Sequence, residues 1–172
     1  PFSFTENLSV SFWVKSTQTA TSTFIGKDVN TSGGRNWMVM LYQNKVYFWT
    51  TSTGNISNLN SIQSDVAGGI SDGEWHHIVC VNNYTDSTKQ IYIDGNLDIT
   101  NNEGAAISNS NSPVQIGRRS SGFPYDGEMS NVALFNTAFT SSQVETLYNN
   151  GSPGDISSLS PTAWYKLDSS EI

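Results

Sequence analysis

Short runs of alternating apolar and polar residues recur along this chain. Residues 8–14 place Leu, Val, Phe and Val at every second position, with Ser, Ser and Trp between them. Because successive side chains of a strand point to opposite faces, this period of two predicts a strand with one buried face and with Trp13 on the other. Three further apolar runs predict strands at 23–27, 36–42 and 45–51.

Two Asp-Gly pairs punctuate the middle of the chain. Asp72–Gly73 precedes a β-branched apolar run, and Asp94–Gly95 stands between two short alternating segments. Asp-Gly favours tight turns because Gly adopts positive φ and the Asp side chain bonds nearby backbone, so antiparallel hairpins are expected here. Near the other end, Thr140 and Gln143 form a capping-box pattern for one short helix, closed by Gly151 and expected against the edge of the sheets.

Composition limits the partners of the chain. The 172 residues carry a net charge of -7, with 36% hydrophobic and only 13% charged residues, which suits one all-β domain over residues 1–172. With 8 basic residues and this acidity, nucleic acid is excluded as a partner. No apolar run is long enough for membrane insertion, and the first residues do not form a targeting signal. Cys80 is the single cysteine, expected to be buried.

An ordered set of motifs resembles a known family. Asp-Gly-Glu-Trp-His-His-Ile at 72–78, Tyr-Ile-Asp-Gly at 92–95, Ile-Gly at 116–117 and Tyr-Asp-Gly-Glu-Met at 125–129 lead to the short helix. This order is similar to that of laminin G-like and pentraxin-like domains of the concanavalin A-like lectins and glucanases. The resemblance implies a two-sheet antiparallel jelly roll with one short helix near its C-terminal end.

The same family includes lectins, adhesion modules, scaffolds and enzymes, so the function has to be argued from the residues of a site and not from the fold alone. A glycosidase requires two carboxylates facing the scissile bond, and the glutamates here are isolated along the sequence, so we do not expect an enzyme. Two hypotheses remain. The first is a non-catalytic carbohydrate-binding or adhesion module that recognises glycans, acidic ones included, through rim loops. The second is a structural or protein-interaction repeat of a larger surface or virion protein; both imply an extracellular, cell-surface or virion-associated location.

The candidate ligand site combines basic and aromatic residues. Arg118 and Arg119 stand side by side on a loop that also carries Phe123 and Tyr125, in an otherwise acidic chain. Guanidinium groups match carboxylate or sulfate oxygens, and aromatic rings stack on sugar faces. The alternative is a local ion pair, for example with Asp126 or Glu128. Trp37 and Trp49 are weaker stacking candidates.

Metal binding has weak support. Asp28 to Gly33 match the first half of an EF-hand loop, but position twelve is Val39 and no helices flank the loop. Pentraxins carry an acidic calcium-binding segment where this chain has two arginines. His76 and His77 point to opposite faces of a strand, so they cannot chelate one ion together. The sequence does not define a cofactor. A structural calcium ion stays an open alternative, with weak candidate ligands at Asp28, Asn30, Asp126 and Asp168.

The last residues, 161–172, contain Trp-Tyr-Lys-Leu-Asp, which resembles the opening strand of the family. The chain begins beyond that strand and ends with one like it. Three arrangements are open: the strand completes its own sandwich as a circular permutation, starts the next repeat of an array, or inserts into a neighbour to give a homo-oligomer. We favour self-completion because exposed Trp164, Tyr165 and Leu167 would lose several kcal/mol of apolar burial.

Overall fold

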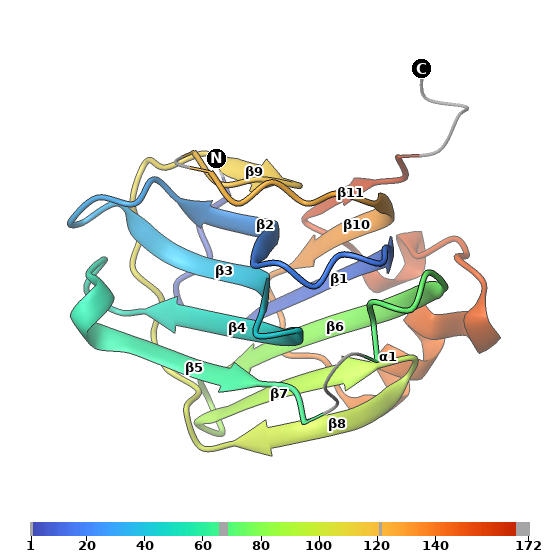
Figure 1. Cartoon of the computed structure of the whole chain (residues 1–172). Coiled ribbons are helices and arrows are strands. Elements are labelled where there is room, and N and C mark those ends of the chain that lie inside the picture. Colours follow the sequence, from blue (N-terminus) through green and yellow to red (C-terminus); the bar gives the residue numbers. More distant parts are fainter. Residues whose placement is uncertain (1, 66–68, 121, 168–172) are drawn as a thin grey trace.

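The chain folds into two antiparallel sheets that face each other across one core, as a computed structural model describes for residues 2–65, 69–120 and 122–167 (Figure 1). The six-stranded sheet consists, in spatial order, of β11 (Ala163–Tyr165), β10 (Glu128–Phe135), β1 (Leu8–Lys15), β6 (Trp75–Asn83), β7 (Thr88–Ile93) and β8 (Asn96–Asn101). The five-stranded sheet consists of β5 (Leu59–Gln63), β4 (Lys45–Thr51), β3 (Arg35–Tyr42), β2 (Ser22–Asp28) and β9 (Val114–Ile116). The predicted all-β, two-sheet jelly roll is confirmed.

The core lies between the sheets and is filled by alternate side chains of the facing strands. Each sheet contributes its inward residues, among them Leu8, Val10, Phe12 and Val14 from β1 and Trp37, Val39 and Leu41 from β3. The rings of Phe12 and Phe24 lie 5.3 Å apart across the two sheets. Cys80 is fully buried in this core, as expected. Burial of so many apolar side chains, at about 1.5–3 kcal/mol each, is the main force that holds the sheets together.

The helix covers a face of the six-stranded sheet rather than an edge. α1 (Ser141–Tyr148) buries Val144 and Leu147 against side chains of β6, β7 and β10. The capping box of Thr140 and Gln143 is present, and the helix ends at Tyr148, with Asn149 in the left-handed conformation. The expectation of an edge position was wrong because the outward residues of β6 and β10, such as Val79 and Phe135, are apolar and need a cover.

Two turns have the backbone that hairpins require. Asp94 and Gly95 join β7 to β8 with φ of 50° and 78°, and Gln43 and Asn44 join β3 to β4 with φ of 53° and 59°. Positive φ at both central residues matches the twist of the flanking strands. The Asp94 carboxylate also accepts the backbone N–H of His77 at 2.9 Å, which fixes the hairpin against β6.

The C-terminal strand lies in the chain's own sheet. β11 pairs antiparallel with β10 at the border of the six-stranded sheet, with Trp164 opposite Ala133. Two backbone bonds extend this pairing, from Thr162 N to Leu134 O at 2.8 Å and from Asn131 N to Lys166 O at 2.9 Å. Asp168 lies outside the described residues.

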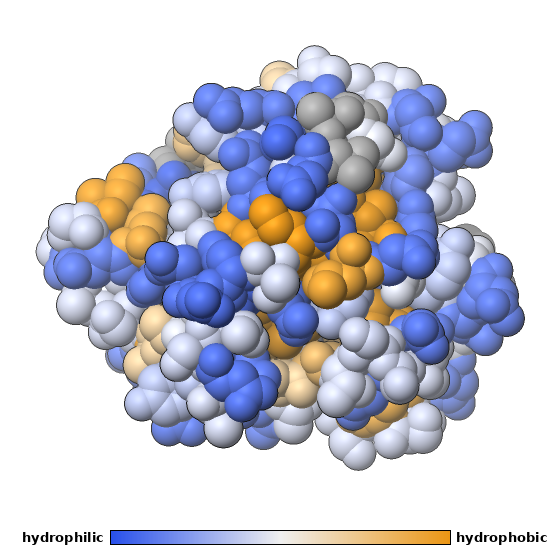
Figure 2. Space-filling view, turned by 90° about the horizontal axis from the view of Figure 1, so that it is seen from below, coloured by the Kyte–Doolittle hydropathy of each residue, from blue (hydrophilic) through white to orange (hydrophobic). Residues whose placement is uncertain are grey.

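At the opposite border of the sandwich, polar side chains connect the last strand of the six-stranded sheet, β8, to β5 of the other sheet. Asn101 donates to Ser61 O at 3.0 Å, and Asn60 donates to Glu103 at 3.0 Å, so β8 and its following residues are tied to β5. Seen from below, hydrophobic residues show in the middle of the molecule among hydrophilic ones (Figure 2). Leu97 on β8 is 47% exposed. No helix among the described residues is long and apolar enough to cross a membrane.

Candidate functional site

The loop that carries both candidate arginines is fixed to the end of β2. Three backbone bonds hold it: Gly117 N to Phe24 O at 2.7 Å, Thr23 N to Phe123 O at 2.9 Å, and Tyr125 N to Gly117 O at 2.8 Å. Arg119 and Gly122 exchange a pair of backbone bonds at 3.1 Å. The described residues of the loop are therefore tied by backbone bonds to β2 and to one another.

Arg119 folds back along the sheet to a buried carboxylate. Its Nη2 lies 2.6 Å from Oδ2 of Asp28, whose side chain has no exposed surface. Arg35 approaches the same Oδ2 at 3.3 Å through Nη1. Asn30 accepts from both guanidinium groups, at 2.5 Å in the case of Arg119, and its backbone N–H donates to Asp28 at 2.7 Å. Two guanidinium groups thus share one carboxylate.

The charges of this cluster do not cancel. Arg35 and Arg119 carry two positive charges against the single negative charge of Asp28. Burial lowers the pKa of Arg119; the charge of Asp28 opposes this change and that of Arg35 adds to it. An arginine stays protonated at neutral pH in spite of such a shift. A net positive charge therefore remains here in a chain of net charge -7.

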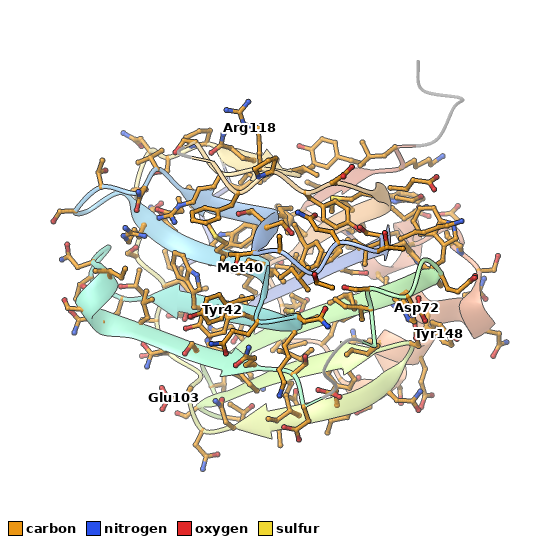
Figure 3. The ribbon with its side chains drawn as sticks, viewed as in Figure 1. Met40, Tyr42, Asp72, Glu103, Arg118 and Tyr148 are labelled. Carbon is orange, nitrogen blue, oxygen red and sulfur yellow. The ribbon has the colours of Figure 1, made fainter. Side chains whose placement is uncertain are left out.

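Arg118 lies beside this cluster and points away from the body of the molecule (Figure 3). Its side chain is exposed and forms no hydrogen bond or ion pair with the described residues. Arg118, Arg119, Gly122 and Pro124 line an open pocket of about 220 Å³. Phe123, the next residue of the same loop, is 41% exposed. The sequence-predicted pair is therefore divided: Arg119 is held in an ion pair and Arg118 is free to meet a ligand.

The structure corrects the partner expected for the arginines. The sequence suggested Asp126 or Glu128 as partners for a local ion pair. Arg119 instead pairs with Asp28, which lies 91 positions away along the chain. Both expected carboxylates are exposed and line another hollow, of about 400 Å³, together with Lys15 and Gly73.

Three aromatic candidates do not offer a free ring face. Trp37 is fully buried in the core, and Trp49 is 3% exposed and packs in a small cluster with Met38 and Met40. Neither ring can stack on a sugar, so these two predictions are wrong. Tyr125 is half-buried, its ring edge-on to Phe24 at 5.1 Å, and burial raises its pKa to about 12. Tyr125 supports the loop. Phe123, which the sequence places on the same loop but which was not among the predicted ligand-binding residues, is the exposed aromatic residue there.

The weak calcium candidates that lie within the described residues, Asp28, Asn30 and Asp126, do not gather into a cation site. Asp28 and Asn30 face two guanidinium groups, which repel a divalent cation. Asp126 is exposed; its carbonyl oxygen accepts from Ser16 Oγ at 2.5 Å, and its backbone N–H donates to Gln18 Oε1 at 2.8 Å. Within residues 2–65, 69–120 and 122–167, no three His, Cys, Asp or Glu side chains are placed to hold a metal. The described residues around Asp28 therefore offer guanidinium groups and no set of carboxylates for a calcium ion.

The two adjacent histidines occupy different environments, as the strand geometry predicted. His76 contacts Asp94 at 2.7 Å and Asp72 at 3.1 Å. Burial lowers the pKa of His76, but the bonds to Asp94 and Asp72 outweigh this effect and raise it overall. His77 lies on the outer face, with Nε2 2.8 Å from Ser11 Oγ, and burial lowers its pKa to about 4. The two side chains do not share a ligand.

Two antiparallel sheets around one core, with a short helix on the outer face, define a lectin-type jelly roll. The chain belongs to the concanavalin A-like lectin/glucanases superfamily, because the laminin G family model of that description matches residues 1–145. A search of curated proteins found no match.

Solved structures with this fold include binding domains of several kinds. A heptameric SAP-like pentraxin from Limulus polyphemus is 18% identical, with a TM-score of 0.63 over 84% of this chain and 70% of the pentraxin. A carbohydrate-binding protein of Bacteroides ovatus, so described provisionally, is 18% identical, with a TM-score of 0.74 over 98% of this chain and 47% of that protein. The botulinum neurotoxin D ligand-binding domain in complex with N-acetylneuraminic acid is 16% identical, with a TM-score of 0.62 over 87% and 37%.

Proposed function

We propose that this chain is a non-catalytic carbohydrate-binding module and that it recognises acidic glycans through the loop between β9 and β10. The observation that carries the proposal is the unbalanced charge beside an open pocket: two guanidinium groups share Asp28, and Arg118 is exposed next to them. A carboxylate or sulfate oxygen of a glycan supplies the missing negative charge, and a guanidinium binds such groups through paired N–H donors.

Each part of the loop has a distinct role in this proposal. Arg118 contacts the acidic group, because its side chain is free of other described partners. Arg119 is a positioning residue, because its bond to Asp28 at 2.6 Å fixes the loop over β2. Phe123, 41% exposed, offers a ring face to the sugar. Such a module acts outside the cell or on a surface, where glycans are displayed, as part of a longer protein.

The test compares charged and uncharged forms of one sugar. Titration calorimetry uses sialylated and sulfated oligosaccharides together with their asialo and desulfated counterparts. The acidic forms are expected to bind, with affinity that falls as salt rises, because exposed charges are screened. Arg118→Ala should weaken binding by about tenfold or more, since a hydrogen bond to a charged group contributes about 1.5–3 kcal/mol.

The control variant is Lys45→Ala, which changes the net charge equally at the turn between β3 and β4. This variant should bind as the unchanged protein does. Equal losses in both variants would show that only overall charge matters, and unchanged affinity in Arg118→Ala would reject the loop as the site.

A further inference from the structure

A second concave surface lies on the outer face of the six-stranded sheet, away from the arginine loop. It consists of three adjoining hollows that share lining residues. The first, of about 160 Å³, is lined by Trp13, Trp75, Ser130 and the segment at Gly151 and Pro153. The second, of about 480 Å³, is lined by Asn131, Pro153, Gly154, Asp155, Trp164 and Lys166. A narrow cavity of about 10 Å³ joins them, with Trp13, His77, Asn131 and Pro153 in its wall.

The floor of this groove is built from stacked aromatic rings. Trp13 points outward from β1, with the His77 ring 5.0 Å from it on β6. Tyr148, the last residue of α1, stacks on Trp13 at 5.9 Å. Trp13 is only 4% exposed, so it shapes the floor and leaves contact with a ligand to the residues above it.

A bulge in β10 brings polar groups into the same groove. The register between β1 and β10 shifts between Ser11 and Trp13, and Asn131 has φ of 48° at this point. Asn131 Oδ1 accepts from Trp164 Nε1 at 3.1 Å, and Nδ2 donates to Ser130 Oγ at 2.9 Å. Bulges re-aim side chains in this way near functional sites.

The rims combine two tryptophans with one charge of each sign. Trp75 is 39% exposed at one end. At the other end Trp164 is half-buried, with the ammonium of Lys166 5.1 Å from its ring and with Asp155 in the same wall. Among the described residues that line this end, the opposite charges of Lys166 and Asp155 balance each other, in contrast to the arginine loop. Flat rings with hydroxyl, amide and carboxylate groups between them match the faces and hydroxyls of uncharged sugar rings.

One buried group lacks a partner at the centre of the groove. His77 is 1% exposed and lines the narrow cavity, and its Nδ1 has no hydrogen-bond partner among the described residues. Buried polar atoms are normally satisfied, so an unpaired nitrogen here marks a position for a water or a ligand hydroxyl. This observation is independent of the aromatic rims.

We propose that this groove is a second carbohydrate subsite, which binds an uncharged oligosaccharide between Trp75 and Trp164. The inference rests on the proposed function as a carbohydrate-binding module, but it requires no residue of the arginine loop. Trp75 and Trp164 stack on sugar rings, and Ser130 and Asp155 bond the hydroxyls between them.

The five tryptophans allow a test on the unchanged chain. Their indole N–H signals are followed by 1H–15N NMR during titration with uncharged hexasaccharides of glucose, mannose, xylose and galactose. The signals of Trp75 and Trp164 are expected to shift together with at least one of these probes. Trp37, in the core, and Trp49, on the other sheet, serve as internal references and should not move.

Paired variants separate this groove from the arginine loop. Trp75→Ala should weaken the uncharged probe by about fivefold or more, as expected for loss of one stacked ring. Tyr42→Ala removes a ring of similar exposure, 40%, from β3 of the other sheet and should leave that affinity unchanged. If no uncharged hexasaccharide shifts Trp75 and Trp164 while an acidic glycan still binds through Arg118, this inference is overturned and the proposed function stands. If neither class binds, both are overturned.

Discussion

His77 should make the protein lose stability in mild acid. The side chain is 1% exposed between Trp13 and Ser11, and burial lowers its pKa to about 4, against an ordinary value of 6.5. Between these two values the unfolded chain binds a proton at this position and the folded chain does not. Folding stability therefore falls as pH decreases from about 6.5 to about 4 and levels off below that.

The size of the effect follows from the difference between the two pKa values. The shift from 6.5 to about 4 corresponds to about 3 kcal/mol when the full window is crossed, at 1.36 kcal/mol for each pKa unit. At pH 5 the loss should already be about 2 kcal/mol. A domain of this length loses about 2–4 °C in Tm for each kcal/mol, so Tm should fall by about 6 °C at pH 5.

The assay is urea unfolding between pH 4 and 7.5, followed by tryptophan fluorescence. His77→Gln keeps a donor near Ser11 but cannot titrate, so its stability should vary less with pH by about 2 kcal/mol at pH 5. His76→Gln is the matched control: the raised pKa of His76 adds stability below pH 6.5 that is lost as pH rises through its folded value, so this variant should show a steeper acid loss. Equal pH profiles for His77→Gln and the unchanged protein would refute the reasoning.

Two further predictions concern the core and the C-terminal strand. Burial lowers the pKa of Lys89 to about 7, so above that pH the unfolded chain binds the proton more readily than the folded chain, and folding stability should rise by about 2 kcal/mol from pH 7 to 9. Urea unfolding at several pH values should show this rise, and the same rise in Lys89→Met would contradict the assignment to Lys89. Deletion of residues 161–172 removes Trp164 and the backbone bonds of β11, so calorimetry should show a loss of roughly 2–3 kcal/mol and of about 5–10 °C in Tm, and an unchanged Tm would contradict this role.

Alternation of residue types was sufficient to predict most strands. The segment 45–51 matches β4 residue for residue, and 36–42 differs from β3 only by Arg35. Burial on one face of a strand fixes which positions are apolar, so the alternation predicts the strand without knowledge of tertiary contacts. The turn at Asp94–Gly95 could be predicted equally well, because positive φ at both positions favours those residue types.

The same pattern could not distinguish a covered face from an exposed one. Trp37 on β3 faces the core and Trp49 on β4 faces outward, yet both are buried. The residue pattern alone does not distinguish such positions from an exposed ring that could contact a ligand. Trp75 and Trp164 belong to strands that were predicted, but their place in one groove depends on the bulge at Asn131 and on the segment after α1. Outward alternation of Trp13, Trp75 and His77 was the available signal.

The arginine loop shows a second limit. Arg118 and Arg119 were identified from an unusual pair of charges, and the basic character of the site is visible in the sequence alone. Their different roles were not, because the partner of Arg119 is Asp28 on a strand far away along the chain. Near neighbours in sequence were therefore the wrong choice of ion-pair partner, and only the pairing of β2 with β9 brings the actual one close.

The most direct measurement is a glycan array with the purified chain, run once with calcium and once with a chelator. The proposed function predicts reproducible binding to acidic glycans in both conditions, because the proposed contact to the acidic group is a guanidinium group and uses no metal ion. Binding that disappears with the chelator would contradict the arginine mechanism. A blank array in both conditions would contradict the carbohydrate-binding function itself.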